Sequence, residues 1–304
     1  MTQEFLKASA VLVALVLRGD GASAQRDAHA GAAKQPGFSY TMTATSESGA
    51  GVRMGITGGE GSRRYVAHAV VGPHRGRMDI VDGSVPDLFA RGDYLLFDST
   101  EIVIVHPATS TFALLTEQTT RATGAIDTSD VKMKVSDEKV RLDSIGPGDT
   151  ISTYPTTHFR MTLGFNMDVE AMMARSRFGS EAVTDYWVAS IPGMMSNPLL
   201  RSNGLAGSHG VPGMLRELSL RVDSASQRMG RTVVLRSSSV TRVVVGQGAT
   251  IESHNAVQVS DLQRASVDEH SFIVPLSYKV VAIPGLPADS LGDGVKWKTP
   301  PPGR

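Results

Sequence analysis

The side chains whose types and spacing suggest chemistry are the histidines, one serine-containing turn and a group of acidic residues. His68 and His74 are separated by Gly72-Pro73, which breaks the alternation that would place both on one face of a strand. Zinc needs three or four converging ligands, and no H-x-x-x-H or H-E-x-x-H spacing occurs. Gly207-Ser208-His209-Gly210 lacks the G-x-S-x-G spacing of a nucleophile turn. These residues predict no catalytic group and no metal site.

The acidic residues and the cysteine content narrow the chemistry further. Asp127, Asp130, Asp137 and Glu138 do not follow the intervals around a glycine that an EF-hand loop requires, so we interpret them as turn and solvent residues. The sequence contains no cysteine, which excludes thiolate catalysis and cysteine-bound zinc. We therefore expect a protein that has no enzymatic activity and no cofactor.

Methionines gather in the middle third of the sequence, beside other large apolar residues. Methionine is flexible and polarizable, and it lines adaptable binding surfaces as well as irregular cores. Two interpretations follow, a cavity for an apolar ligand under a mobile cover, or plain core packing beneath loops. The first interpretation assigns these residues to a ligand cavity: Phe165, Met167, Met172, Met173, Trp187, Met194, Met195, Leu199 and Leu200.

The N-terminal residues have the pattern of a secretory signal peptide. Lys7 precedes an apolar run from Ala8 to Leu17, and Ala22-Ser23-Ala24 forms an A-x-A cleavage site before Gln25. We expect residues 1–24 to be a signal peptide and residues 25–36 to be a flexible leader. The protein is then exported, to the periplasm or as a secreted protein, and the sequence leaves these two destinations open.

Charge and hydropathy bear on the partners of the mature chain. The formal net charge is zero, whereas a nucleic-acid partner would need a basic face. No segment after the signal approaches the apolar length of a membrane-spanning helix. We therefore expect no nucleic-acid partner and no transmembrane segment in the mature chain.

Most of the remaining sequence has the pattern of β-strands. Asp93–Phe97, Glu101–Val105 and Thr111–Leu115 contain apolar runs separated by turn residues, which predicts an antiparallel meander. Leu215–Val222 alternates and also predicts a strand. Val169, Met172 and Met173 recur at helical spacing, which predicts a helix over Asp168–Phe178. We expect one mainly β (α+β) domain over residues 37–283 and a disordered tail over 284–304.

Short phrases along the chain can be compared with known families. They are Arg77-Met78-Asp79-Ile80, Glu101-Ile102-Val103-Ile104-Val105-His106-Pro107 with Thr111-Phe112 and Leu114, Gly148-Asp149-Thr150-Ile151, Thr157-His158-Phe159-Arg160-Met161, Asp185-Tyr186-Trp187-Val188, and the closing Val267-Asp268, Phe272-Ile273-Val274-Pro275 and Tyr278-Lys279-Val280. Together these phrases resemble an exported bacterial family of unknown function that is related in fold to the periplasmic lipoprotein carrier LolA and its outer-membrane receptor LolB. The resemblance implies a curved antiparallel half-barrel sheet whose concave face is covered by short helices or loops.

Taken together, the residues and the resemblance favour a non-enzymatic binding protein. Its partner would be an apolar small molecule, a lipid or a lipidated protein held in the half-barrel cavity. The alternative is an envelope module for protein interaction or stress sensing, in which the sheet edge or the concave face binds another protein. A hydrolase is a distant third hypothesis, because no convergent Ser, His and Asp residues are evident in the sequence.

Overall fold

The computed structural model describes residues 34–48, 61–85, 88–98, 101–115, 131–171, 174–201, 216–245 and 248–282. The predicted signal peptide and the predicted C-terminal tail lie outside these ranges, as do Met172 and Met173. The elements along the chain are β1 (Gln35–Ser48), β2 (Gly61–Val71), β3 (Gly76–Val85), β4 (Phe89–Ala90), β5 (Tyr94–Phe97), β6 (Ile102–His106), η1 (Pro107–Thr109), β7 (Thr111–Leu115), β8 (Val131–Pro147), β9 (Thr157–Ala171), β10 (Ala174–Ala189), α3 (Pro198–Arg201), α4 (Arg216–Gln227), β11 (Val233–Val245), β12 (Ala249–Val267), η3 (Glu269–Phe272) and β13 (Lys279–Val280).

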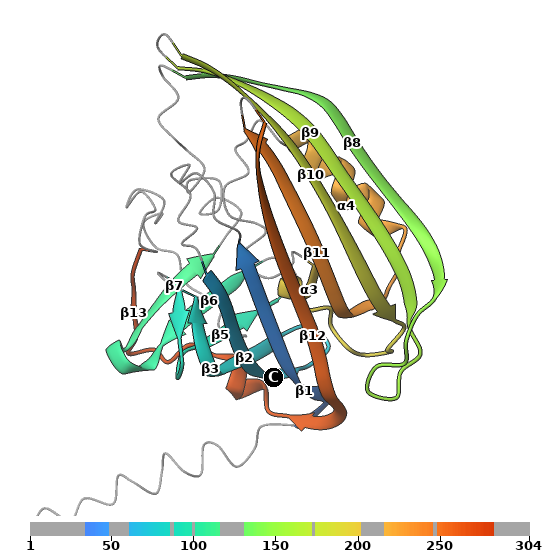
Figure 1. The fold of residues 1–304 in the computed structure, drawn as a ribbon. Coiled ribbons are helices and arrows are strands. Elements are labelled where there is room, and N and C mark those ends of the chain that lie inside the picture. Colours follow the sequence, from blue (N-terminus) through green and yellow to red (C-terminus); the bar gives the residue numbers. More distant parts are fainter. Residues whose placement is uncertain are drawn as a thin grey trace, which may run out of the picture. The chain divides into compact units, whose positions relative to one another are not determined.

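The described chain is mostly β-strand, with few helices, and forms one large open sheet (Figure 1). The strands run in the order β13-β7-β6-β5-β3-β2-β1-β12-β11-β10-β9-β8, and β4 pairs with β3 beside this path. All strand pairs along the path are antiparallel except β13 with β7. The predicted mainly β fold is therefore confirmed. The expected leader ends too late, because Gln35 and Pro36 already pair with β12.

The register places one row of side chains on the same face of the sheet across its centre. Residues directly opposite in an antiparallel pair share a face, and the pairing is continuous from β9 to β2. We call the face defined by this row the helix face. The row consists of Phe159, Tyr186, Ser237, Val257, Ala44 and Tyr65.

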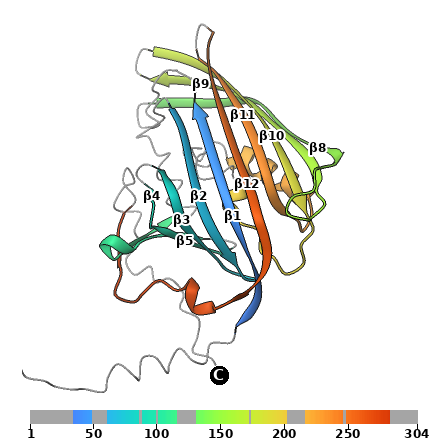
Figure 2. The ribbon, with the colours of Figure 1, turned by 60° about the horizontal axis from the view of Figure 1, so that its bottom comes forward.

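The helices pack on this helix face (Figure 2). Helix α3 contacts β11, and the side chain of Asn197 before it reaches Tyr40 of β1. Helix α4 contacts β8, the last strand of the sheet. None of the helices in the described ranges is long and apolar enough to cross a lipid bilayer.

The predicted meander of β5, β6 and β7 is confirmed, and it explains why these strands are apolar along their whole length. Leu95 and Leu96 are adjacent and point to opposite faces, yet both are 0% exposed. Leu95 belongs to the main core cluster, whereas Leu96 packs with Val274 in a second cluster on the other face. The chain around Val274 therefore covers the face of the meander opposite the helices. Strands that are buried on both faces have continuous apolar sequences, without polar alternation.

The predicted helix over Asp168–Phe178 is wrong, because this segment belongs to the hairpin of β9 and β10. Ala171 pairs with Ala174, and both strands continue without interruption on either side. Asp168, at the start of the predicted helix, instead lies across the hairpin from Arg177. The alternation of the preceding strand, with Phe165 and Met167 on the helix face, continues into this segment and outweighs the short helical spacing.

The predicted strand over Leu215–Val222 is also wrong, because α4 is a helix from Arg216 to Gln227. Leu218, Leu220 and Val222 alternate like a strand, and this alternation caused the error. The longer pattern is helical, since Leu218, Ala225 and Met229 are buried along one face. Leu220, which fits only the strand pattern, is 59% exposed.

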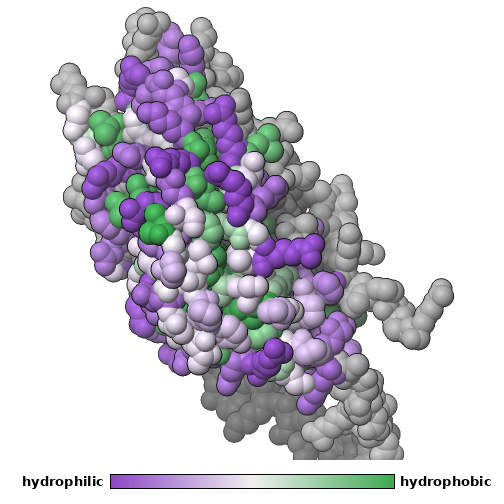
Figure 3. Space-filling model, turned by 90° about the vertical axis from the view of Figure 1, so that its right-hand side faces the viewer, coloured by the Kyte–Doolittle hydropathy of each residue, from purple (hydrophilic) through white to green (hydrophobic). Residues whose placement is uncertain are grey.

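The outer edge of the sheet is a long strand with charged side chains. Lys134, Lys139 and Arg141 are exposed on β8, where the sheet ends. Two register irregularities interrupt its pairing with β9. Charges and bulges are the features that keep an open edge from pairing with another chain. The side of the molecule on which β8 lies is largely hydrophilic, with scattered apolar residues (Figure 3).

The crowding around Gly37 generates a stability prediction. A methyl group at Gly37 would clash with the carbonyl oxygen of Val71 and the side chain of Val267, so β1 fits between its two neighbours only with glycine. Gly37→Ala should lower the free energy of unfolding by about 2 kcal/mol or more in a denaturant titration.

Gly164→Ala is the matched control, because a methyl group added to this strand glycine would have its nearest neighbouring atoms at 3.8 Å and 3.9 Å. It should leave stability unchanged or raise it by about 0.5 kcal/mol. Equal effects of the two substitutions would contradict the proposed crowding at Gly37.

Candidate functional site

The short helix α3 is held on the sheet by Asn197, which is 0% exposed. Its side-chain oxygen accepts a hydrogen bond of 2.9 Å from the backbone N–H of Leu199. Pro198 follows at the first helical position, so the chain has both an asparagine cap and a proline start. The side-chain nitrogen of Asn197 donates to the Tyr40 hydroxyl at 3.0 Å. One side chain thus caps the helix and joins it to the centre of the sheet.

The partner of Asn197 is a phenol that stays protonated. Burial raises the pKa of Tyr40 well above its usual value, and the hydrogen bond from Asn197 offsets only part of this shift. The contact is therefore between neutral groups in the core. Such a hydrogen bond stabilises modestly when made and is costly to break, because both groups lose water on burial.

Most of the residues that the sequence assigned to a ligand cavity lie on the helix face or in the core. Met194, Leu199 and Leu200 are buried in the main core cluster, and Met195 packs against it. Phe165 and Met167 are half-buried on β9, away from α3. Met172 and Met173 lie outside the described residues. The described methionines near α3 therefore contribute to the core packing between this helix and the sheet.

Trp187 lies on the face opposite the helices, because it is one residue from both Tyr186 and Val188, which are buried on the helix face. Its indole stacks on the His158 ring, with centroids 4.6 Å apart and planes at 4°. The Arg236 guanidinium lies over its other face, 3.8 Å from the ring centroid. Gly148 approaches so closely that a methyl group there would clash with the indole. Both faces of Trp187 are thus occupied by protein.

Asp185 of β10 links the Trp187–His158 stack to β9 through hydrogen bonds. It accepts hydrogen bonds from His158 at 2.7 Å and from Arg160 at 2.9 Å and 3.1 Å. Burial alone would raise the pKa of Asp185, but these hydrogen bonds and the charge of the Arg160 guanidinium outweigh burial and lower it. A second pair joins His106 to Asp93 at 3.0 Å. Within the described ranges, no group of three His, Asp or Glu side chains is placed to hold a metal ion.

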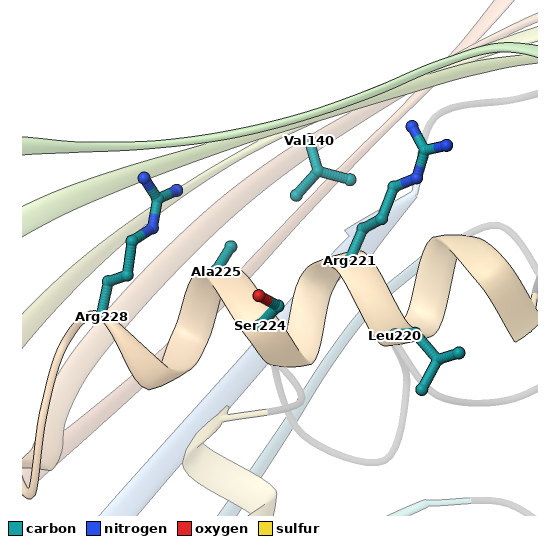
Figure 4. Close-up of a pocket in the computed structure, with 6 residues that line it drawn as sticks. All are labelled: Val140, Leu220, Arg221, Ser224, Ala225 and Arg228. Atoms are coloured by element: carbon teal, nitrogen blue, oxygen red, sulfur yellow. The ribbon is translucent and has the colours of Figure 1, made fainter.

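An open cavity lies between α4 and β8, and it is the candidate binding site of the described chain. Its volume is about 360 Å³, which is within the range of small-molecule sites, roughly 300–1,000 Å³. We call it the α4 groove. Val140 comes from β8, and α4 together with the residue after its end supplies the other lining residues, which are Leu220, Arg221, Ser224, Ala225 and Arg228 (Figure 4). The Arg221 and Arg228 side chains extend toward the strands on either side of Val140 and Ala225 (Figure 4).

A bulge in β8 places a carboxylate beside one end of the groove. The pairing with β9 shifts between Ser136 and Lys139, and Asp137 adopts a φ of 55° within the shift. Three residues after Asp137, Val140 pairs with Leu163 on the helix face. Glu138 is 16% exposed and lies 3.8 Å from the Arg221 guanidinium. Its Oε2 atom is buried and has no hydrogen-bond partner in the described part of the chain.

The arginines and the serine of the groove are not among the residues that sequence reasoning selected. Reading α4 as a strand separated Arg221, Ser224 and Arg228, which only helical spacing brings to one side. The helical spacing of Leu218, Ala225 and Met229 was the signal that identifies this side. Glu138, in contrast, was considered and interpreted as a solvent residue, since the bulge that turns it inward has no sequence signature.

The position of Asn197 predicts a large effect of its removal. Asn197→Ala leaves both the Leu199 N–H and the Tyr40 hydroxyl without their partner in the core, which should cost about 2–4 kcal/mol of unfolding free energy. Tyr40→Phe removes one hydroxyl and keeps the helix cap, so it should cost about 0.5–1.5 kcal/mol. Thermal and denaturant unfolding measure both, and an Asn197→Ala cost as small as that of Tyr40→Phe would contradict the double role.

The lowered pKa of Asp185 predicts a pH-dependent contribution to stability. A carboxyl group with a lowered folded-state pKa stabilises above its ordinary pKa of about 4, and this stability is lost as the pH falls through the folded-state pKa. Asp185→Asn should therefore cost about 1 kcal/mol at neutral pH, a value kept small by the exposure of Arg160, and the cost should shrink as the pH falls below about 4.

Asp143→Asn provides the control, because Asp143 pairs with the largely exposed Arg141. Its cost should stay within about 0.5 kcal/mol at neutral pH. A cost of Asp185→Asn that does not change between neutral and acidic pH would contradict the assignment.

Comparisons with known proteins leave the chain without an assigned family. No family model matches the sequence, and no curated protein matches it. A solved structure described as an uncharacterized conserved protein from Thermus thermophilus aligns with 86% of this chain and 99% of its own, at 10% identity and a TM-score of 0.32. Likeness at this level assigns neither a fold family nor a function.

Proposed function

We propose that this chain is an exported, non-enzymatic binding protein that holds the apolar part of a ligand between α4 and the sheet. The ligand is an apolar small molecule, a lipid or a lipidated protein. The observation that carries the proposal is the α4 groove, an open cavity of about 360 Å³ with Val140 and Ala225 between its strand and helix walls. A site that is concave and partly apolar, with few polar groups, is the usual form of a small-molecule site.

In this proposal the sheet acts as a half-barrel of the LolA/LolB type, and α3 and α4 cover its concave face. The packing of both helices on the helix face supports this arrangement. Helix α3 is fixed by Asn197, whereas α4 stands beside the edge strand with the groove between them. The groove therefore lies where a ligand chain can enter from the open edge of the sheet.

Export is part of the same proposal and rests on the sequence of residues 1–24. Their charged start, short apolar run and A-x-A site are typical of a secretory signal peptide. Periplasmic and secreted locations fit equally. A binding protein in either compartment carries apolar molecules through water. The burial of each methylene group of the ligand contributes about 0.8 kcal/mol to the free energy of binding.

The direct test is the content of the protein as it is made. The full chain is expressed with its own signal, purified without detergent and extracted with organic solvent, and the extract is analysed by mass spectrometry. A stoichiometric lipid or other apolar molecule is the expected result. A clean extract from folded protein would contradict the proposal and favour the envelope protein-interaction module. Crosslinking in the envelope would then identify the protein partner of that module.

Filling the groove tests its position. Ser224 is exposed on α4 and lines the groove, so Ser224→Trp should occupy the cavity and reduce the co-purified ligand at least fivefold while the protein stays folded. Gln227→Trp adds the same bulk to an exposed position of the same helix that does not line the groove. This control should keep the ligand. Equal ligand content in both variants would place the binding site elsewhere.

A further inference from the structure

We propose that the ligand of the α4 groove is a single-chain amphiphile with an anionic headgroup, and that Arg228 binds this headgroup. The inference rests on the proposed function and adds the chemical class of the ligand. It is carried by the uneven distribution of charge along the groove, which has a different electrostatic character at each end.

At one end of the groove the positive charge has a negative neighbour. Arg221 lies 3.8 Å from Glu138, whose side chain is 16% exposed. A carboxylate this buried, with one oxygen that has no hydrogen-bond partner among the described residues, repels a second anion at the same place. The Arg221 end of the groove is therefore unfavourable for an anionic headgroup.

At the other end the positive charge is uncompensated. Arg228 has no carboxylate within ion-pair distance among the residues that the structure describes, and its guanidinium extends toward the strands (Figure 4). Its position after the last turn of α4 favours a cation, because the helix dipole is negative there. A guanidinium binds carboxylate or phosphate oxygens through paired hydrogen bonds, which a neutral headgroup does not offer.

The apolar residues lie between these two ends. Val140 and Ala225 separate the two guanidinium groups (Figure 4). An alkyl chain lying against them, with its headgroup at Arg228, makes apolar contacts and also pairs with the uncompensated cation. A purely apolar ligand would make only the apolar contacts, and a free anion would make only the ion pair. Charge complementarity thus selects an amphiphile and sets its direction in the groove.

The experiment compares ligands that share a chain and differ in the headgroup. The full chain, freed of co-purified lipid, is loaded with the neutral fluorescent probe N-phenylnaphthylamine. Displacement is then measured with an alkyl carboxylate, an alkyl phosphate and an alkyl alcohol of equal chain length, each below its micelle concentration, and with inorganic phosphate alone. The variants are Arg228→Gln and, as a control, Arg231→Gln, which changes an exposed arginine that does not line the groove.

We expect the carboxylate and the phosphate amphiphiles to bind about tenfold more tightly than the alcohol. Arg228→Gln should lower the affinity for both anionic amphiphiles to that for the alcohol, whereas Arg231→Gln should keep the preference. Inorganic phosphate alone should not displace the probe. The preference should weaken at high salt, because the groove is open to water.

The possible failures separate the two proposals. If the alcohol binds as tightly as the anionic amphiphiles, or if the preference survives in Arg228→Gln, the headgroup inference is wrong and the apolar binding function stands. Displacement by inorganic phosphate at similar concentration would show an anion site without a chain site, which also overturns the inference. If neither the probe nor any amphiphile binds, the proposed function itself fails.

Discussion

The pairing of β1 with β12 is the constraint on which the rest of the structure depends. It joins the strands β2 to β7 on one side to the strands β11 to β8 on the other, so that a single sheet includes both halves of the chain. The register runs from Gln35 opposite Val267 to Ser48 opposite Ser253. Because side chains alternate, a slip of one residue would turn Val257 and Val259 from the core to the opposite face. Gly37 allows β1 to lie this close to its neighbours.

From this register the two faces of the sheet acquire different roles. The helix face carries the buried row through Tyr186 and Val257, and it receives α3 through Asn197 and α4 beside β8. The opposite face carries the stack of His158, Trp187 and Arg236, in which each aromatic surface is already occupied. Of these two faces, the helix face holds the cavity that the described residues form between α4 and the sheet. The proposed binding site is therefore formed by α4 and β8.

The sequence predicted the fold where the pattern is local and repeated. The meander of β5 to β7 could be recognised because its apolar runs are separated by turn residues such as Pro107. The sequence did not predict the β9–β10 hairpin, because Val169, Met172 and Met173 have helical spacing by chance. Helix α4 was missed because Leu220 continues an apparent alternation, although the structure leaves this side chain exposed.

The candidate site was predictable only in part, for a physical reason. Which side of α4 meets β8, and which carboxylate the bulge before Lys139 turns inward, depend on pairing between distant segments. No local pattern encodes those contacts. The apolar residues near α3 were identified from composition, and the structure packs Leu199 and Leu200 in the core. The charged groups of the groove became visible only once the helix lay against the strand.

Photocrosslinking tests the central claim most directly. The full chain is incubated with an alkyl carboxylate that carries a photoreactive diazirine in its chain, irradiated, digested and analysed by mass spectrometry. The account predicts labelled peptides from β8 around Val140 and from α4 between Leu220 and Arg228, with labelling reduced by an unlabelled alkyl carboxylate of the same length. Labelling confined to the opposite face, for example around Val244, or labelling that the competitor does not reduce, would contradict it.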